Sequence, residues 1–332
     1  MPVETGVAYF ANRMPRHIRE DMRDVVEHHC TYVLHTFSEN DFARHREVMK
    51  DIVRITHDFG LKVWLDSWGM GRVFAGEVSG FCGEHPEARE VLSDGAPFAR
   101  ACLYAPEFRK FMQDWTDAAA ATKPEAIFWD EPNLPYHEPE QGRPARWGCR
   151  CERCQSLFRD RFGHAMPVEM DEEVIDFRHQ SVVDFLDFVT KYAHTRDLEN
   201  AICCMIAKDT RFGDKNWDDI ISLPAVDNFG TDPYCHGRTD IPSVVSYYSE
   251  HTRRLVDLVK RYGKAHHIWV QAFGIKAGCE QEIVDAIVAV REAGSENIAA
   301  WGFAGCESND YRCQRPEIAW EAIGEGFRRL RW

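Results

Sequence analysis

Short apolar or alternating stretches are separated by longer amphipathic ones along the whole chain. Eight short stretches predict buried strands at 6–11, 31–37, 61–68, 126–131, 201–207, 226–232, 267–273 and 297–303. Apolar residues at helical spacing predict intervening helices at 42–59, 106–119, 172–194, 243–262, 280–293 and 316–330. Strands that alternate with helices form parallel βαβ units, and eight such units close a barrel. We therefore expect an α/β protein with one (β/α)8 TIM barrel spanning residues 1–332.

Two of the predicted connections are long. One covers about 69–105 after the third strand, and the other covers about 132–148 after the fourth. Long loops in a compact fold are usually lids, binding walls or metal-held segments. Both follow the carboxyl ends of strands, where barrel enzymes keep their chemistry. An open doubly wound sheet is less consistent with the pattern, because no glycine-rich phosphate turn follows the first strand.

Composition narrows the classes of partner. A formal charge of −14 argues against nucleic acid, whose affinity comes largely from Lys and Arg. No apolar run approaches the roughly 20 residues that span a bilayer, and residues 1–5 show no secretory signal. We therefore expect a cytoplasmic protein with no membrane partner. In that compartment the twelve cysteines are expected to be reduced, with clustered thiols on metal.

Two adjacent carboxylates end the fourth predicted strand. The apolar run 126–129 leads into Asp130 and Glu131, and Pro132 closes it. Carboxylates at the mouth of a buried strand are costly unless they are solvated or used. Like charges side by side raise one pKa, so the pair is expected to hold one proton, as a general acid requires. We expect Glu131 to be that acid, with Asp130 beside it and Asp232, at the sixth strand, as a second catalytic carboxylate.

Polar and aromatic side chains are also predicted at the other strand ends. Aromatic rings cover the C–H faces of sugars, whereas carboxylates and amides take the hydroxyls. This pattern predicts a sugar site whose binding residues are His35, Asp66, Trp68, Tyr234, Gln271, Trp301 and Glu307. Several have simpler alternatives: His35 as a core histidine, Asp232 as the start of a turn, and Gln271 as part of a buried hydrogen-bond network.

A cysteine cluster follows the carboxylate pair. Cys149-x-Cys151-x-x-Cys154 has metal-ligand spacing. It resembles the zinc-binding cluster of family 42 glycoside hydrolases, which are β-galactosidase-type TIM barrels of clan A. In that family the fourth ligand lies in a Cys-x-x-x-Pro-x-aromatic-Arg stretch, which the segment from Cys102 to Arg109 matches.

The resemblance implies a structural Zn²⁺ held by Cys102, Cys149, Cys151 and Cys154. Four thiolates leave no open coordination position. The ion would join the two long loops within a zinc-binding region at about 69–163. The alternatives are an iron–sulfur or redox role, unligated cysteines, and Cys82 in place of Cys102.

Clan A enzymes carry an Asn-Glu acid/base at the fourth strand and a glutamate nucleophile at the seventh. By position Glu131 inherits the acid/base role, but Gln271 stands where the nucleophile is expected. An amide cannot form a glycosyl ester. The second group is therefore open between Asp232, Asp66 and the adjacent Asp130. The last arrangement resembles family 20 hexosaminidases, in which an aspartate orients the acetamido group of the substrate.

The leading hypothesis is a glycoside hydrolase whose partner is a small glycoside or oligosaccharide. Barrels of this family often self-associate, so a homo-oligomer is expected. One alternative is a catalytically degenerate, sugar-binding barrel. Another is a barrel lyase or metal-dependent hydrolase using His35, Asp66, Asp232 and His236.

Overall fold

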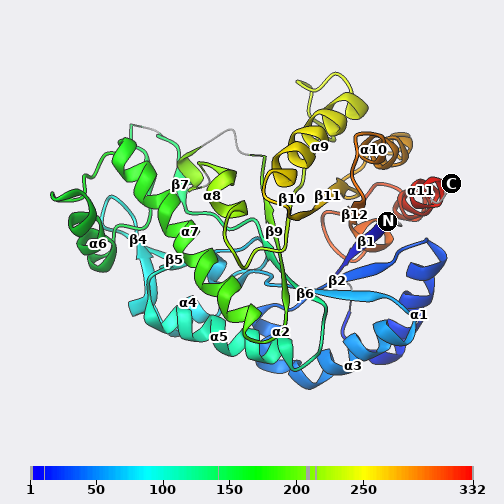
Figure 1. Cartoon of the computed structure of the whole chain (residues 1–332), viewed down its shortest axis with the longest axis horizontal. Coiled ribbons are helices and arrows are strands. Elements are labelled where there is room, and N and C mark those ends of the chain that lie inside the picture. The colour runs from blue at the N-terminus through cyan, green and yellow to red at the C-terminus, as the bar shows by residue number, and fades with distance from the viewer. Residues whose placement is uncertain (1–2, 11, 141, 207–209, 214, 331–332) are drawn as a thin grey trace.

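Eight parallel strands close into a barrel in the order β1-β12-β11-β10-β9-β6-β3-β2 (Figure 1). The computed structural model describes residues 3–10, 12–140, 142–206, 210–213 and 215–330, so the predicted strand ends at Ala11 and Ala207 lie outside the described residues. The barrel strands are β1 (Glu4–Tyr9), β2 (Tyr32–Thr36), β3 (Lys62–Asp66), β6 (Ala126–Asp130), β9 (Glu199–Cys204), β10 (Asn228–Thr231), β11 (Ala265–Gln271) and β12 (Asn297–Trp301). Each lies within or overlaps one predicted stretch, so the TIM-barrel prediction is confirmed.

Helices surround the barrel and bury their apolar faces against it (Figure 1). They are α1 (Pro15–Glu27), α2 (Glu39–Arg44), α3 (Arg46–Asp58), α4 (Phe81–Glu84), α5 (Pro106–Ala120), α6 (Glu152–Phe162), α7 (Glu172–His194), α8 (Trp217–Ile221), α9 (Val244–Lys260), α10 (Gln281–Glu292) and α11 (Pro316–Arg329). The segment predicted as one helix at 42–59 is divided at His45 into α2 and α3. None of the described helices is long and apolar enough to cross a membrane.

Large side chains fill the barrel interior. Tyr32, Trp64, Phe128 and Trp269 form a buried cluster with small residues from neighbouring strands. Close approach is possible because Gly6 on β1 has no Cβ, and a Cβ there would overlap the ring of Tyr32. The interior is thus a packed core, as in other TIM barrels. A ligand can bind only at an end of the barrel.

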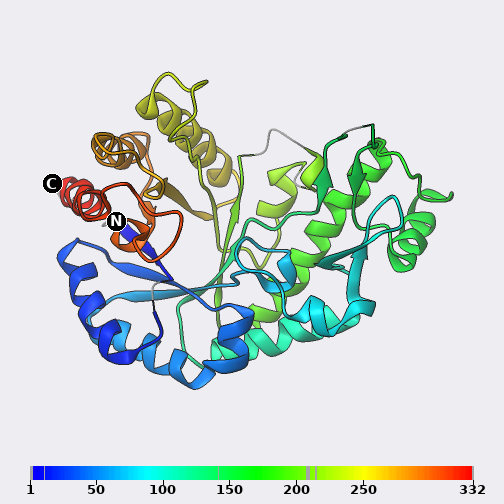
Figure 2. The ribbon, with the colours of Figure 1, turned by 180° about the vertical axis from the view of Figure 1, so that it is seen from behind.

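The two long loops form a layer on one side of the barrel, next to α6 (Figure 2). The loop after β3 contains the hairpin of β4 (Arg89–Val91) and β5 (Pro97–Ala101), and the loop after β6 contains β7 (Tyr136–His137) and β8 (Arg146–Trp147). Backbone bonds between the described residues join the loops: Asn133 N–H donates to the Val73 carbonyl at 3.2 Å, Ser93 N–H to the Trp147 carbonyl at 2.8 Å, and Arg150 N–H to the Val91 carbonyl at 2.7 Å.

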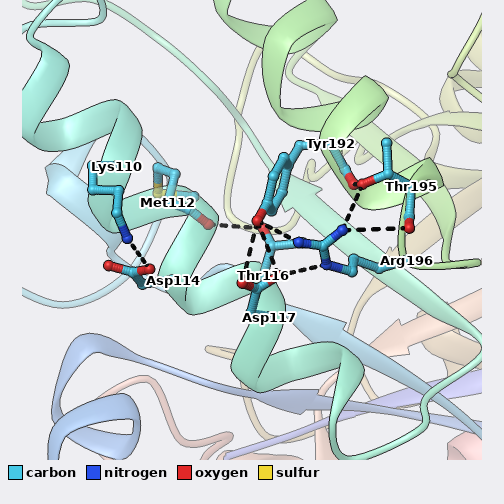
Figure 3. Close-up of polar contacts among 8 residues, drawn as sticks. All are labelled: Lys110, Met112, Asp114, Thr116, Asp117, Tyr192, Thr195 and Arg196. Carbon is cyan, nitrogen blue, oxygen red and sulfur yellow. Dashed lines mark hydrogen bonds and ion pairs between the residues drawn. The ribbon is translucent and has the colours of Figure 1, made fainter.

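Helices α5 and α7 flank this layer and are joined by polar contacts at their exposed surface (Figure 3). Arg196, just after α7, donates from Nε to Asp117 of α5 at 2.6 Å, and the Tyr192 hydroxyl donates to the same carboxylate at 3.1 Å. Exposed pairs of this kind contribute about 0–1 kcal/mol each. The buried apolar faces therefore supply most of the stability of this helix pair.

The packing of the barrel floor generates a stability prediction. Gly6→Ala should lower the free energy of unfolding by about 1–3 kcal/mol, because the new methyl group overlaps Tyr32 in a filled core. Gly83→Ala in α4 is the matched control, since a Cβ there meets nothing within 4 Å. Urea denaturation of both variants measures the effect. Equal stability of the two variants would contradict a tightly filled barrel.

Candidate active site

A cavity of about 700 Å³ opens at the carboxyl ends of the barrel strands. Residues that end or follow β1, β2, β3, β6, β10, β11 and β12 line it, and they include Phe10, Arg13, Asp41, Trp68, Glu77, Asp130, Glu131, Asp232, Tyr234, Phe273 and Trp301. A second hollow of about 600 Å³ lies on the outer surface between α5 and α7. Its polar groups bond one another, as Tyr104 does with Asp184 at 2.8 Å. The barrel cavity is therefore the candidate site.

The backbone at Glu131 turns the end of β6 toward this cavity. Side chains alternate along a strand, so Phe128 and Asp130 face the barrel interior and the next residue should face the helices. Glu131 instead adopts a φ of +44°, which residues with a Cβ seldom do. Its N–H still donates to the Cys203 carbonyl at 3.0 Å, and both carboxylates line the cavity. A left-handed non-glycine residue costs about 1–2 kcal/mol, and such strain concentrates at functional sites.

Four carboxyl groups meet at the base of the cavity. Asp232 is hydrogen-bonded to Glu131, which requires one proton between the two carboxyls. Burial raises the pKa of Asp232 well above its ordinary value, and the charge of Glu131 and this bond raise it further. Burial and the Glu131 charge likewise raise the pKa of Asp130. For Asp66, burial acts first and the charges of Asp130 and Glu131 add to it.

The raised pKa of Asp130 has the direction expected for a proton held at this strand end, and burial is its largest cause. The physical reason is the one expected from the sequence: ionised carboxylates in a water-poor site repel one another. The proton is shared more widely than predicted, because Asp66 and Asp232 belong to the same electrostatic cluster.

Aromatic rings form one wall of the cavity. The rings of Trp68 and Trp301 stack with centroids 5.5 Å apart at 27°, and Phe10 lies parallel to Trp68 at 6.2 Å. Tyr234 meets Phe273 edge-on at 5.0 Å. Trp68, Tyr234 and Trp301 thus line the cavity beside the carboxyl cluster, as the sugar-site hypothesis expects.

The other four predicted binding residues do not line the cavity. His35 is fully buried in the barrel wall and bonds the Thr56 hydroxyl of α3 at 2.9 Å, so it is a core histidine. Burial lowers its pKa to about 3. Asp66 is fully buried and acts on the cavity only through its charge and proton. Glu307 is exposed to solvent outside the lining.

Gln271 is used within the protein. Its Oε1 accepts from the backbone N–H of His236 at 3.0 Å, and its Nε2 donates to the Phe273 carbonyl at 3.2 Å. The side chain therefore holds the segment after β10 against the end of β11. The prediction that Gln271 binds the sugar is replaced by the hydrogen-bond-network alternative.

Several lining residues were not predicted, and the most informative are Arg13 and Asp41. Arg13 donates to Asp41 through Nε at 2.8 Å and Nη2 at 2.7 Å, and Nη2 also reaches the Thr36 carbonyl at 2.8 Å. Both follow barrel strands, so listing every polar residue after each strand would have found them. Asn12, Asn40, His45, Glu77, Asn309 and Tyr311 belong to the same group.

The four cysteines expected to bind zinc come together between the long loops. The sulfurs of Cys102, Cys149, Cys151 and Cys154 all lie within 4.8 Å of one another, and none of the twelve cysteines, all of which the structure describes, forms a disulfide. Cys102 Sγ is 3.7 Å from that of Cys151 and 3.6 Å from that of Cys154. A tetrahedral ion with metal–sulfur bonds of about 2.3 Å separates its sulfurs by about 3.8 Å. The cluster is therefore compatible with one metal ion.

The reserve ligand, Cys82, takes no part in this cluster. It is buried, and its Sγ contacts the carbonyl oxygen of Gly71 at 3.7 Å. Arg153 lies beside the cluster and hydrogen-bonds Cys102. A cation at this point offsets the negative charge that four thiolates bring.

Comparison with known proteins identifies the fold. No family model and no curated protein matches the chain. Among solved structures, GH5_18 from Streptomyces cattleya in complex with GlcNAc aligns with a TM-score of 0.61 at 13% identity, over 99% of this chain and 80% of that one. The endo-1,4-β-mannanase from Rhizomucor miehei aligns with a TM-score of 0.61 at 8% identity, over 98% of this chain and 95% of that one.

A D-allulose 3-epimerase from Methylomonas sp. also aligns, with a TM-score of 0.51 at 9% identity, over 99% of this chain and 97% of that one. At such identities the likeness shows the barrel fold alone. The structural neighbours include the glycoside hydrolases that a resemblance to clan A predicts. The closer resemblance to family 42 stays a prediction.

The burial of Asp66 generates a prediction about stability and pH. In the unfolded chain this carboxyl ionises near its ordinary pKa, about 3.9, whereas in the folded protein it keeps its proton to higher pH. The folded state then binds more protons, so this group lowers the free energy of unfolding as pH rises above about 4. Asp66→Asn removes the ionisation and should stabilise the protein more at pH 8 than at pH 5.

Urea denaturation at the two pH values measures this difference. Asp160→Asn, which changes an exposed aspartate on α6, is the matched control and should show no pH-dependent gain. An equal effect of Asp66→Asn at both pH values would show that Asp66 ionises alike in the folded and unfolded protein.

Proposed function

We propose that this protein is a glycoside hydrolase that cleaves a small glycoside or oligosaccharide in the barrel cavity. One observation carries the proposal: the strained backbone at Glu131 directs its carboxyl into a cavity with an aromatic wall, in contact with Asp232. Glycoside cleavage needs a proton donor for the leaving oxygen and a second carboxylate for the anomeric carbon. The two carboxyls supply this pair.

In this proposal the proton that the raised pKa keeps on Asp232 passes to Glu131 when substrate binds, so that Glu131 acts as the general acid and the ionised Asp232 as the nucleophile. Inversion needs carboxyls about 6.5–9.5 Å apart, with a water between them, whereas retention needs about 5–5.5 Å. The side chains of Glu131 and Asp232 contact each other, and this closeness favours retention. Asp232 attacks the anomeric carbon while Glu131 protonates the leaving oxygen. Glu131 then takes a proton from the water that cleaves the glycosyl ester, which frees Asp232.

Asp130 supports this pair from the same strand end. It is 6% exposed, lines the cavity and carries a raised pKa. When Asp130 is protonated and neutral, it does not repel the negative charge that Asp232 must carry in order to attack. When ionised, it is a hydrogen-bond acceptor for the sugar.

The alternative of a metal-dependent barrel enzyme has less support. His35 lies in the barrel wall, and His236 Nδ1 is 2.7 Å from a carboxylate oxygen of Glu282. Neither histidine lines the cavity. Among the described residues, the four cysteines are the one group of three or more potential ligands whose atoms converge closely enough for one ion.

We also propose that the ion in the cysteine cluster is structural Zn²⁺. Zinc favours four thiolates in a tetrahedron, and such a site has no position open for substrate. Cys102 comes from the loop after β3, Cys149 and Cys151 from the loop after β6, and Cys154 from the first turn of α6. The ion would fasten the loops together beside the cavity wall.

The proposed acid makes a prediction about leaving groups. Glu131→Gln should lower kcat/KM about 10²–10⁴-fold for glycosides with an alkyl or sugar leaving group, because these depart only with a proton. The loss should be smaller for 4-nitrophenyl glycosides, which leave without one. Asp232→Asn should reduce turnover of both kinds equally, and Glu317→Gln, an exposed control on α11, should change neither.

The pH profile gives a second measurement. In the wild type kcat/KM should fall on the alkaline side, as the carboxyl cluster loses the proton that the acid needs. The residual kcat/KM of Glu131→Gln should not fall on the alkaline side. Full turnover by Glu131→Gln on unactivated glycosides would exclude Glu131 as the acid.

The zinc proposal predicts one zinc per chain by elemental analysis of the purified protein. Cys154→Ser should lose the metal and unfold at lower temperature, because three thiolates hold the loops less tightly. Cys82→Ser changes a buried cysteine of the same loop region outside the cluster and should retain the metal. Iron in place of zinc, or no metal in the wild type, would contradict the proposal.

A further inference from the structure

The charges that line the cavity are strongly one-sided. Five carboxyl groups face it, from Asp41, Glu77, Asp130, Glu131 and Asp232. Among the described lining residues, Arg13 is the one arginine or lysine.

Arg13 is already fully engaged in the protein. Its guanidinium bonds both carboxylate oxygens of Asp41 and also reaches the backbone and hydroxyl oxygens of Thr36. An anionic ligand such as a uronic acid or a sugar phosphate would therefore meet carboxyls and no free cation within the described lining.

The base of the cavity holds acceptors that lack donors. Asp232 lines the cavity and is only 9% exposed, yet its Oδ1 has no hydrogen-bond partner among the described residues. Both carboxylate oxygens of Asp66, which is fully buried, also lack a partner in the described part of the chain. Buried acceptors of this kind cost about 1–3 kcal/mol each when unsatisfied. A ligand that brings several donors and a positive charge relieves that cost.

A divalent metal ion fits these oxygens poorly. An ion needs ligand atoms that converge on one point, and the four carboxyls do not form such a group among the described residues. An ammonium group is less demanding, because its three N–H donors reach acceptors separately. The ring faces of Phe10, Trp68 and Trp301 beside the cluster also attract cations.

We infer that the cavity is selective for a sugar that carries a protonated amine, with its ammonium group bound by Asp130 and Asp232. The inference rests on the proposed function, because it names the substrate class of the same site. An amine on the carbon next to the anomeric centre lies beside the reacting bond. It therefore meets the two carboxyls that flank Glu131.

A matched set of sugars tests the selectivity without any variant. Glucosamine, galactosamine and mannosamine are compared with their N-acetyl forms and with glucose, galactose and mannose, by calorimetry with the wild-type protein at pH 7. In at least one configuration the amine should bind about tenfold more tightly than both neutral partners. If every amine binds no better than its neutral counterparts, the inference is wrong.

Proton release gives an independent readout. The titratable groups that act electrostatically on Asp130 and Asp232 are Asp66 from β3, Glu131 after β6, Cys203 from β9 and Tyr234 after β10. Burial raises the pKa of Asp130 and Asp232, so they carry protons that an ammonium displaces. Binding heats of the amine in buffers of different ionisation enthalpy should reveal protons released. Heats independent of buffer would overturn this placement.

Two variants locate the contact. Asp130→Asn should remove most of the preference for the amine, whereas Glu77→Gln removes an exposed carboxylate of the rim and should keep the preference within about twofold. Equal loss in both variants would mean that the general field of the cavity selects cations, and would overturn the specific contact. If Asp130→Asn fails to fold, the sugar series and the buffer heats still decide the inference.

The two proposals fail separately. Hydrolysis of neutral glycosides with no preference for amines would leave the proposed function standing and reject the amine selectivity. Tight, amine-selective binding without turnover of any amino-sugar glycoside would support the amine selectivity and reject the proposed hydrolase function.

Discussion

The structure depends on a barrel that is filled to its upper end with aromatic and aliphatic side chains. Tyr32, Trp64, Phe128 and Trp269 leave no space for ligand or bulk water inside. Asp66, Asp130 and Asp232 at the strand ends therefore rest on an apolar floor, and burial raises the pKa of each because that floor cannot solvate their charge. The contact between Glu131 and Asp232 is one consequence, since a shared proton spares the buried Asp232 an unsolvated charge.

The walls of the site depend on how the long loops are held. The loop after β3 is fixed to the end of β6 because Ala75 N–H donates to the Asp130 carbonyl at 3.0 Å. Glu39, at the start of α2, accepts from the N–H groups of Gly71 at 2.8 Å and Phe81 at 2.7 Å. The cysteine cluster joins this loop to the one after β6 on the far side. Polar contacts thus add to the hydrophobic packing of these loops, which bury Phe74 and Trp147 in the main core.

The strands were predictable from sequence because parallel strands buried on both faces read as apolar runs. The direction of the side chains was harder to predict. Tyr32 and Leu34 face the barrel interior, so His35 must face the helices, and attention to this alternation would have excluded it from the site. The same alternation predicts that Glu131 faces the helices. Glu131 lines the cavity instead, because its left-handed backbone breaks the alternation at the strand end.

Other parts of the site depend on tertiary contacts that no local pattern encodes. The bonds of Arg13 to Asp41 join segments that follow different strands. The cysteines were easier to predict, because metal-ligand spacing is local for three of the four and a recognisable stretch contains the fourth. The proton-sharing cluster was foreseen for Asp130 and Glu131, which are adjacent in sequence, but its extension to Asp66 depends on the pairing of β3 with β6.

The position of the second carboxylate explains why the two acids touch. In the clan A pattern the acid follows the fourth barrel strand and the nucleophile the seventh, with two strands between them. Here the seventh strand, β11, ends in Gln271, whose amide is bonded on both sides, and Asp232 follows the sixth strand, β10. Only β9 separates β6 from β10. Moving the carboxylate one strand closer shortens the span across the barrel mouth, which brings Asp232 into contact with Glu131.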